Sequence, residues 1–281
     1  MLTLRPNIIS TSAIAATTLS ALFGFPLIAK SQIQYSPLTI QLNAEQGQAK
    51  GIIELTNRGQ TPFRGRVSAE YFTYDKTGFV SVKSGPQDLT PYLTFSPNEL
   101  VIQPGQTRRI RFISQFLPST PQGEYRSVLF TEGLEEIQQK GQYNVGIKPR
   151  FGITVYVRQG ETSQNLVVKS ASFDPQIKQI ELLVNNTGTA TAISHVVWSV
   201  EKEKGKSVTG ETKDFTVITQ GERNILIDSF AGNSKIVPGT YKLTGKLLWG
   251  DKENPQSVPF DLNLTISPEQ ASAANKPSSS R

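Results

Sequence analysis

Strict alternation of apolar and polar residues is the feature of this sequence that most limits its fold. Phe63, Val67, Ala69 and Tyr71 alternate with charged or small polar residues. A period of two is typical of a β-strand with one buried face, whereas the spacing of an amphipathic helix is nearly absent. Turn signals such as Pro104-Gly105 recur between short apolar runs. The sequence therefore predicts an all-β chain built from sandwiches rather than from βαβ units.

Length and an internal repeat indicate two domains. A chain of 281 residues is expected to hold about two domains of about 150 residues each. The run 53–59 resembles the run 182–188, since each is an apolar strand that ends in Asn-x-Gly, and Gly123-Glu124-Tyr125 resembles Gly239-Thr240-Tyr241. Chance similarity of short β motifs is the alternative. The repeat predicts two immunoglobulin-like sandwiches in tandem, at residues 33–160 and 161–266.

The same alternation predicts which residues face the two cores, and in each copy the tyrosine at the head of a strand is expected to close the core edge. The predicted core residues are Ile53, Leu55, Ile110, Phe112, Ile153, Val155, Leu182, Val184, Leu243 and Leu247. Residues 267–281 are small, polar and aperiodic, which predicts a disordered tail.

Composition argues against most chemistry. The chain has no cysteine and one histidine, His195, so thiolate metal sites are excluded and a Ser-His-Asp triad has only one candidate base. We therefore expect no catalytic residue, no metal and no cofactor. The net charge of +6 is spread along the chain without long Lys/Arg runs, which disfavours a nucleic-acid partner.

The N-terminal segment is typical of a secretory signal. Arg5 precedes a mostly apolar stretch at residues 8–28, and Ala29 and Ser31 have the spacing that a signal peptidase prefers. The sequence predicts removal of residues 1–31 with cleavage near Ser31. An uncleaved anchor is the alternative by length. No second long apolar segment follows, so we expect an exported protein without stable membrane insertion after cleavage.

Several motifs, taken in order, resemble the periplasmic pilus-assembly chaperones, the PapD-like proteins of the chaperone–usher pathway. They are Asn57, Phe95-Ser96-Pro97, the segment 104–112 with its Pro-Gly and Ile-Arg-Phe, Pro121-Gln122 before Ser127, and Gly152–Arg158. The resemblance implies two immunoglobulin-like domains in the periplasm that bind secreted pilus or fibre subunits and lend them a strand. An outer-membrane usher is a possible second partner.

One long alternating stretch could supply the donated strand. From Tyr143 to Val157 the apolar residues, with the one exception of Tyr156, keep one parity over about fifteen residues, whereas a strand usually has about five or six. By resemblance to the family, the donor residues would be Tyr143, Val145, Ile147 and Pro149. The alternative is a long core strand of the first domain.

The sequence departs from the family at three places. The family holds the subunit's C-terminal carboxylate with an arginine and a lysine, but the matching positions are near Thr39 to Gln41 and at Thr154. Arg126 stands where the family has an acidic residue, so we expect an altered charge network. Pro149 lacks an N–H inside the proposed donor strand.

Three arginines could replace the missing cations or contact acidic groups: Arg150, Arg158 and Arg111. Because the anchor is missing, a secreted two-domain structural or adhesive protein remains an alternative to the chaperone.

Overall fold

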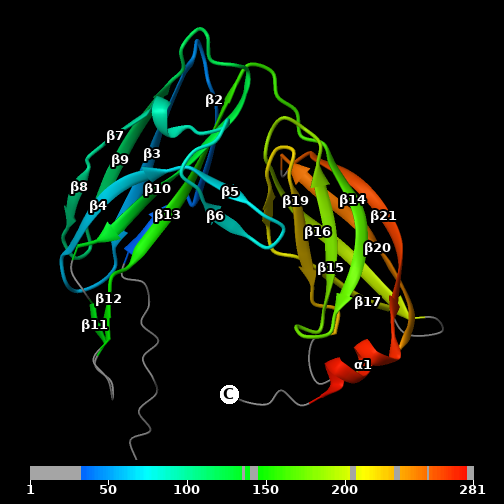
Figure 1. The fold of residues 1–281 in the computed structure, drawn as a ribbon. Helices are drawn as coiled ribbons and strands as arrows, with labels where there is room; N and C mark the ends of the chain where they lie inside the picture. The colour runs from blue at the N-terminus through cyan, green and yellow to red at the C-terminus, as the bar shows by residue number, and fades with distance from the viewer. Residues whose placement is uncertain are drawn as a thin grey trace, which may run out of the picture. The chain divides into compact units, whose positions relative to one another are not determined.

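The computed structural model describes residues 33–134, 137–139, 145–202, 207–230, 235–251 and 253–276, and for residues 137–139 and 145–147 it describes the backbone alone. Strands dominate, beside one short α-helix and the 3-10 turn η1 (Thr90–Tyr92). The prediction of an all-β chain is confirmed (Figure 1). Within the described residues, no helix is long and apolar enough to span a membrane.

The first sandwich packs a four-stranded sheet against a five-stranded one. The four-stranded sheet has the order β1 (Ile33–Ser36), β3 (Gln48–Asn57), β9 (Thr107–Gln115), β7 (Leu93–Ser96). The five-stranded sheet has the order β2 (Thr39–Asn43), β13 (Arg150–Gln159), β10 (Gly123–Gly133), β4 (Phe63–Glu70), β8 (Glu99–Ile102). Two hairpins complete it, β5 (Phe72–Tyr74) with β6 (Phe79–Ser81) and β11 (Ile137–Gln139) with β12 (Val145–Ile147).

The second sandwich packs a three-stranded sheet against a larger one. The three-stranded sheet has the order β14 (Leu166–Asp174), β15 (Gln179–Asn186), β19 (Glu222–Ile227). The larger sheet has the order β17 (Ser207–Glu211), β16 (Ala192–Lys202), β20 (Gly239–Gly250), β21 (Pro255–Ile266), with β18 (Phe215–Val217) also paired to β16. Both sandwiches belong to one compact unit, Gln32–Arg281.

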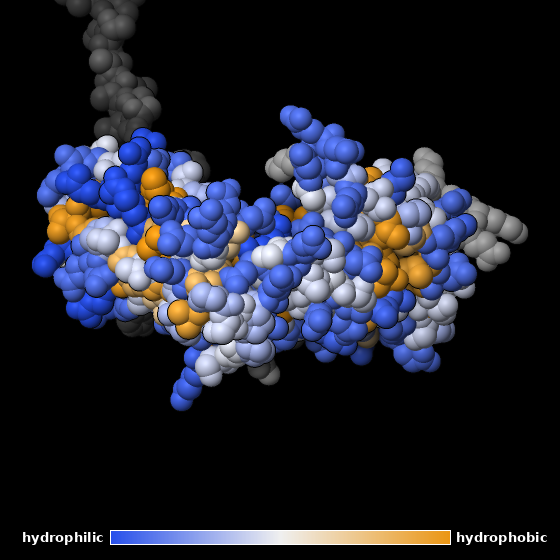
Figure 2. Space-filling view, turned by 90° about the horizontal axis from the view of Figure 1, so that it is seen from above, coloured by the Kyte–Doolittle hydropathy of each residue, from blue (hydrophilic) through white to orange (hydrophobic). Residues whose placement is uncertain are grey.

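Each sandwich encloses its own apolar core. One cluster of buried residues runs from Ile33 to Val157 and another from Leu166 to Ala274. All ten predicted core residues are buried, none with more than 4% of its surface exposed. On the face shown in Figure 2, hydrophobic residues form separate patches among hydrophilic ones. The alternation therefore correctly identified the inward face of each strand.

The repeated Asn-x-Gly turns have the same hydrogen bonds in both sandwiches. The amide of Asn57 donates to the carbonyls of Thr61 (2.7 Å) and Ile102 (2.9 Å), and its oxygen accepts from Gly59 N–H (2.9 Å). The amide of Asn186 donates to the carbonyls of Ala190 (2.8 Å) and Val217 (3.1 Å), and its oxygen accepts from Gly188 N–H (2.9 Å). Both asparagines are fully buried. The sequence repeat therefore corresponds to the same turn structure in both sandwiches.

The two tyrosines of the repeat also match. The hydroxyl of Tyr125 donates to the carbonyl of Pro121 (2.9 Å), and that of Tyr241 donates to the carbonyl of Val237 (2.6 Å), each four residues upstream. Burial raises the pKa of both phenols, so both remain protonated donors at neutral pH. The corner role expected from the sequence is confirmed.

The predicted disorder of residues 267–281 is wrong for part of the segment. Helix α1 (Pro268–Asn275) begins with a capping box. The Ser267 hydroxyl accepts from Gln270 N–H, and the side-chain oxygen of Gln270 accepts from Ser267 N–H. Ala271 and Ala274 are buried in the second core. The side chain of Asn275 forms two hydrogen bonds with the backbone of Ile236: its oxygen accepts from the N–H, and its amide nitrogen donates to the carbonyl. Only two alanines, three residues apart, lie on the buried face of this helix. Two residues are too few to show a helical period in the sequence.

Replacing Asn186 with Ala tests the repeated turn. We expect the free energy of unfolding of the second sandwich to fall by about 2–4 kcal/mol, because buried carbonyls left without donors cost about 1–3 kcal/mol each. Urea unfolding followed by tryptophan fluorescence measures this, since both tryptophans, Trp198 and Trp249, lie in the second core. The exposed Asn263→Ala change is the control. A loss below about 0.5 kcal/mol for Asn186→Ala, the range of ordinary surface changes, would contradict the assignment.

Candidate partner-binding site

Strand β13 has a neighbour on both sides over only part of its length. It pairs antiparallel with β10 from Arg150 to Gln159. On its other side it pairs in parallel with β2, but only over residues 154–158. Residues 150–153 therefore have no second strand within the described part of the chain. This four-residue stretch is an open sheet edge.

The direction of the backbone groups at this edge follows from the ladder. The carbonyl of Arg158 accepts from Ala44 N–H (2.7 Å) on the β2 side. Because successive residues of a strand point to opposite sides, the even-numbered residues of β13 direct their N–H and C=O toward β2 and, beyond its end, toward the open edge. Within the part of the chain that the structure describes, the backbone groups of Arg150 and Gly152 on this side pair with no second strand.

The chain upstream of this edge does not form one continuous strand, so the expectation of a single fifteen-residue strand is wrong. Lys148 and Pro149 separate β12 from β13. The carbonyl of Pro149 accepts from Gly133 N–H (2.8 Å), while its nitrogen has no hydrogen to donate. Strand β12 forms a hairpin with β11, in which Ile147 is opposite Ile137.

The four predicted donor residues are only partly within the described structure. Tyr143 lies outside the described residues, and Val145 and Ile147 are described by their backbone alone. Pro149 is half-buried. Their role as donor residues stays a prediction.

The two positions that would carry the basic anchor lie side by side. Thr154 of β13 is paired with Thr39 of β2, and the Thr154 hydroxyl donates to the Thr39 hydroxyl at 3.1 Å. Both positions thus lie on neighbouring strands, and their match to the family's anchor positions stays a prediction. Two neutral hydroxyls cannot compensate a carboxylate's charge.

The three arginines considered as substitutes lie apart from one another. Arg150 forms an ion pair with Glu70, and its guanidinium lies 3.6 Å from the centre of the Phe130 ring. Arg158 is bound within the protein, as described below. Arg111 is exposed on β9, in the opposite sheet. The structure does not bring these three cations together into one anion-binding site.

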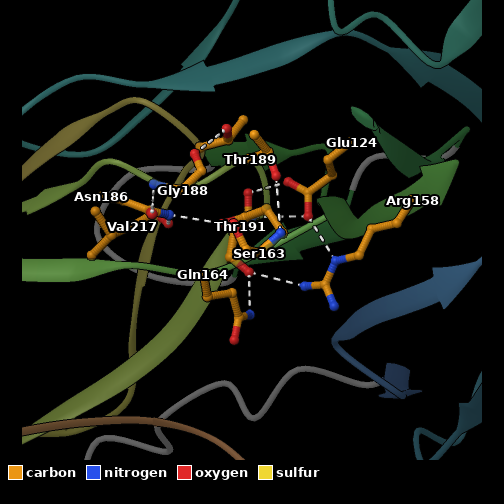
Figure 3. Close-up of polar contacts among 11 residues, drawn as sticks. Glu124, Arg158, Ser163, Gln164, Asn186, Gly188, Thr189, Thr191 and Val217 are labelled. Carbon is orange, nitrogen blue, oxygen red and sulfur yellow. Dashed lines mark hydrogen bonds and ion pairs between the residues drawn. The ribbon is translucent and has the colours of Figure 1, made fainter. Parts of the chain in front are cut away.

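A buried polar network joins the two sandwiches, and Figure 3 shows it around Thr191. The side chain of Glu124 on β10 is fully buried. Its carboxylate accepts from Arg158 Nε (3.1 Å), from Thr191 N–H (2.9 Å) and, at very short range, from the Thr191 hydroxyl. The carbonyl of Thr191 accepts from Arg158 Nη2 (3.0 Å) and from Gln164 Nε2 (2.7 Å). Thr191 is therefore held by three side chains.

Arg126 takes no part in these contacts, and the expectation of an altered charge network stays a prediction. The carboxylate comes from Glu124, two residues earlier, which the sequence analysis treated only as part of a turn before Tyr125. The parity of β10 was the available signal, since residues 124 and 126 share one face. Arg126 has a different role: it is buried and donates to the carbonyl of Phe72 at 3.0 Å.

The hairpin β5–β6 makes a second contact between the sandwiches. Phe72 lies against Tyr156 of β13, with ring centres 5.7 Å apart, and burial raises the pKa of the Tyr156 phenol well above its ordinary value. At the hairpin turn, the carbonyl of Lys76 accepts from Asn224 N–H (2.9 Å), and Lys76 Nζ lies 3.0 Å from Glu222. The hairpin thus covers part of β13 and reaches β19.

The described residues contain no group of three or more His, Asp or Glu side chains arranged to hold a metal ion. His195 is half-exposed on β16, between Glu211 and Asp214.

Glu124→Gln tests the network. Arg158, whose side chain is 18% exposed, would lose its compensating charge, so we expect the free energy of unfolding to fall by about 2–4 kcal/mol. Glu99→Gln is the matched control, because it breaks an ion pair with Arg66 whose side chains are 54% and 63% exposed and should cost less than about 1 kcal/mol. Equal effects of the two changes in urea unfolding would argue against a central role for Glu124.

Comparison with known proteins finds similarity in structure but not in sequence. No family model matches the chain, and no curated protein sequence matches it. The YadV chaperone is 14% identical and matches 83% of this chain and 100% of its own, with a TM-score of 0.47. A chaperone–tip subunit complex, CsuC–CsuE of Acinetobacter baumannii, gives 13% identity over 84% and 100% of the two chains, with a TM-score of 0.46. The CupB2 chaperone of Pseudomonas aeruginosa is 10% identical and matches 82% of this chain and 100% of its own, with a TM-score of 0.43. Each of these matches spans more than four fifths of both chains at a TM-score below 0.5.

Proposed function

We propose that this protein is an exported, non-catalytic chaperone that binds subunits of pili or other surface fibres by donating a β-strand. The observation that carries the proposal is the open edge of β13 at residues 150–153, beside the hairpin β11–β12. An unpaired strand edge readily pairs with another chain.

In this mode of recognition, main-chain hydrogen bonds supply affinity and alternate side chains supply specificity. The backbone groups of Arg150 and Gly152 would continue the ladder into the subunit. The side chain of Ile153 is buried in the chaperone's own core, so it cannot enter a partner. The proposal therefore assigns the inserted side chains to the upstream residues Tyr143, Val145, Ile147 and Pro149.

The missing cations change how a subunit would be held. With Thr39 and Thr154 at the anchor positions, a subunit carboxylate would lack charge-assisted partners there. Binding would then rest mainly on the strand ladder and the inserted side chains. Export to the periplasm, cleavage near Ser31 and delivery to an outer-membrane usher belong to the same proposal.

Ile147→Asp tests the inserted side chains. A charge placed in an apolar groove costs several kcal/mol, so recovery of fibre subunits from the same cells should fall about tenfold or more in co-purification. Val208→Asp is the matched control, because Val208 is 47% exposed on β17 of the second sandwich. Thr154→Ala should leave recovery unchanged. Unchanged recovery with folded Ile147→Asp protein would favour a secreted structural protein instead.

Arg150→Pro tests the backbone ladder separately. Proline removes the N–H that faces the open edge, whereas Arg150→Ala retains it and removes the same side-chain contacts with Glu70 and Phe130. We expect Arg150→Pro to reduce subunit recovery several-fold more than Arg150→Ala does. Equal recovery by the two variants, with unchanged circular dichroism, would show that no ladder forms through residue 150.

A further inference from the structure

A cleft of about 600 Å³ lies between the outer face of β2 and the adjacent end of the second sandwich. The first sandwich contributes Gln41 to its lining. The second sandwich contributes His195 from β16, Glu211 at the end of β17, Asp214 just before β18, and Trp249 from β20. The cleft is distinct from the open edge of β13.

The charged groups that line this cleft are carboxylates. Glu211, Asp214 and Asp251 lie around it, and among the described lining residues none is lysine or arginine. His195 lies between two of the acids, with Nε2 3.5 Å from Glu211 and Nδ1 3.9 Å from Asp214. Three carboxylates face a single imidazole, so acidic groups are in excess in the lining. The cleft therefore favours a cation.

Two hydrogen-bond donors in the lining have no acceptor. Trp249 Nε1 and Gln41 Nε2 are both buried and donate to no group within the described structure. Only 8% of Trp249 is exposed. A buried donor without a partner is costly, so such donors point to an acceptor that a ligand would supply.

The cleft adjoins the anchor positions. Gln41 lies two residues after Thr39 on β2, so the two side chains share the face of the sheet on which Thr154 contacts Thr39. A chain that pairs with the open edge of β13 and runs along this face would reach Gln41 next. At that point it meets acidic rather than basic groups.

We propose that this cleft binds a lysine or arginine side chain of a polypeptide partner. The carboxylates of Glu211 and Asp214 would contact the cation, and backbone carbonyls next to that residue would accept from Trp249 Nε1 and Gln41 Nε2. A lysine or arginine residue would thus compensate the excess negative charge, and the backbone next to it would supply acceptors for the unpaired donors. The assignment of that polypeptide as a fibre subunit rests on the proposed function, and the charge preference does not.

The indole N–H signals of the two tryptophans provide a direct test. Three peptides are added in turn to the protein without residues 1–31. They are acetyl-Val-Lys-Val-amide and the two peptides in which norleucine or glutamate replaces the lysine. We expect the lysine peptide to shift the nitrogen-15 correlated indole signal of Trp249, with an affinity about tenfold higher than that of the other two. Trp198, which does not line this cleft, is the internal reference. Trp198→Phe assigns the signals.

Charge variants complete the test. The double change Glu211→Gln with Asp214→Asn should reduce the affinity for the lysine peptide at least fivefold, whereas Glu99→Gln with Asp261→Asn, outside the cleft, should not. Arg150→Pro should leave peptide binding intact, so failure of the cleft and failure of strand donation can be told apart. Equal shifts by all three peptides, or full binding by the double variant, would overturn the proposal.

Discussion

A carboxylate removed from water must be compensated by charge and hydrogen bonds, and in this protein the compensation of Glu124 involves both sandwiches. Arg158 provides the charge from the first sandwich, and Thr191 provides two donors from the second. Neither sandwich satisfies this buried group alone. One fully buried side chain therefore links the two domains, and the hairpin β5–β6 adds a second contact between them.

Strand β13 connects this contact to the open edge. Its C-terminal part carries Arg158, its middle pairs with β2, and its first four residues have one neighbouring strand in the described structure. An open edge carries a risk of unwanted pairing, which a charged residue such as Arg150 opposes. Under the proposed function, this edge pairs with a selected partner.

The predictions that succeeded rest on local chemistry. Asn57 and Asn186 each bind two carbonyls and one N–H because an asparagine amide can bridge a tight turn, and this pattern is visible in seven residues of sequence. The failures concern context. Helix α1 was missed because composition concealed two alanines on one face, and the long strand was overextended because Pro149 interrupts it without breaking the alternation.

The all-β class, the inward face of each strand, the turn asparagines and the corner tyrosines could be predicted from the amino-acid sequence, because each follows from a period of two or from a few neighbouring residues. Tertiary structure alone decided that Glu124 compensates Arg158, that β13 lacks a second neighbour at residues 150–153, and that Gln41 shares a cleft with Trp249. Periodicity identifies the face on which a side chain lies. Which distant strand lies against that face depends on pairing and packing across the whole chain.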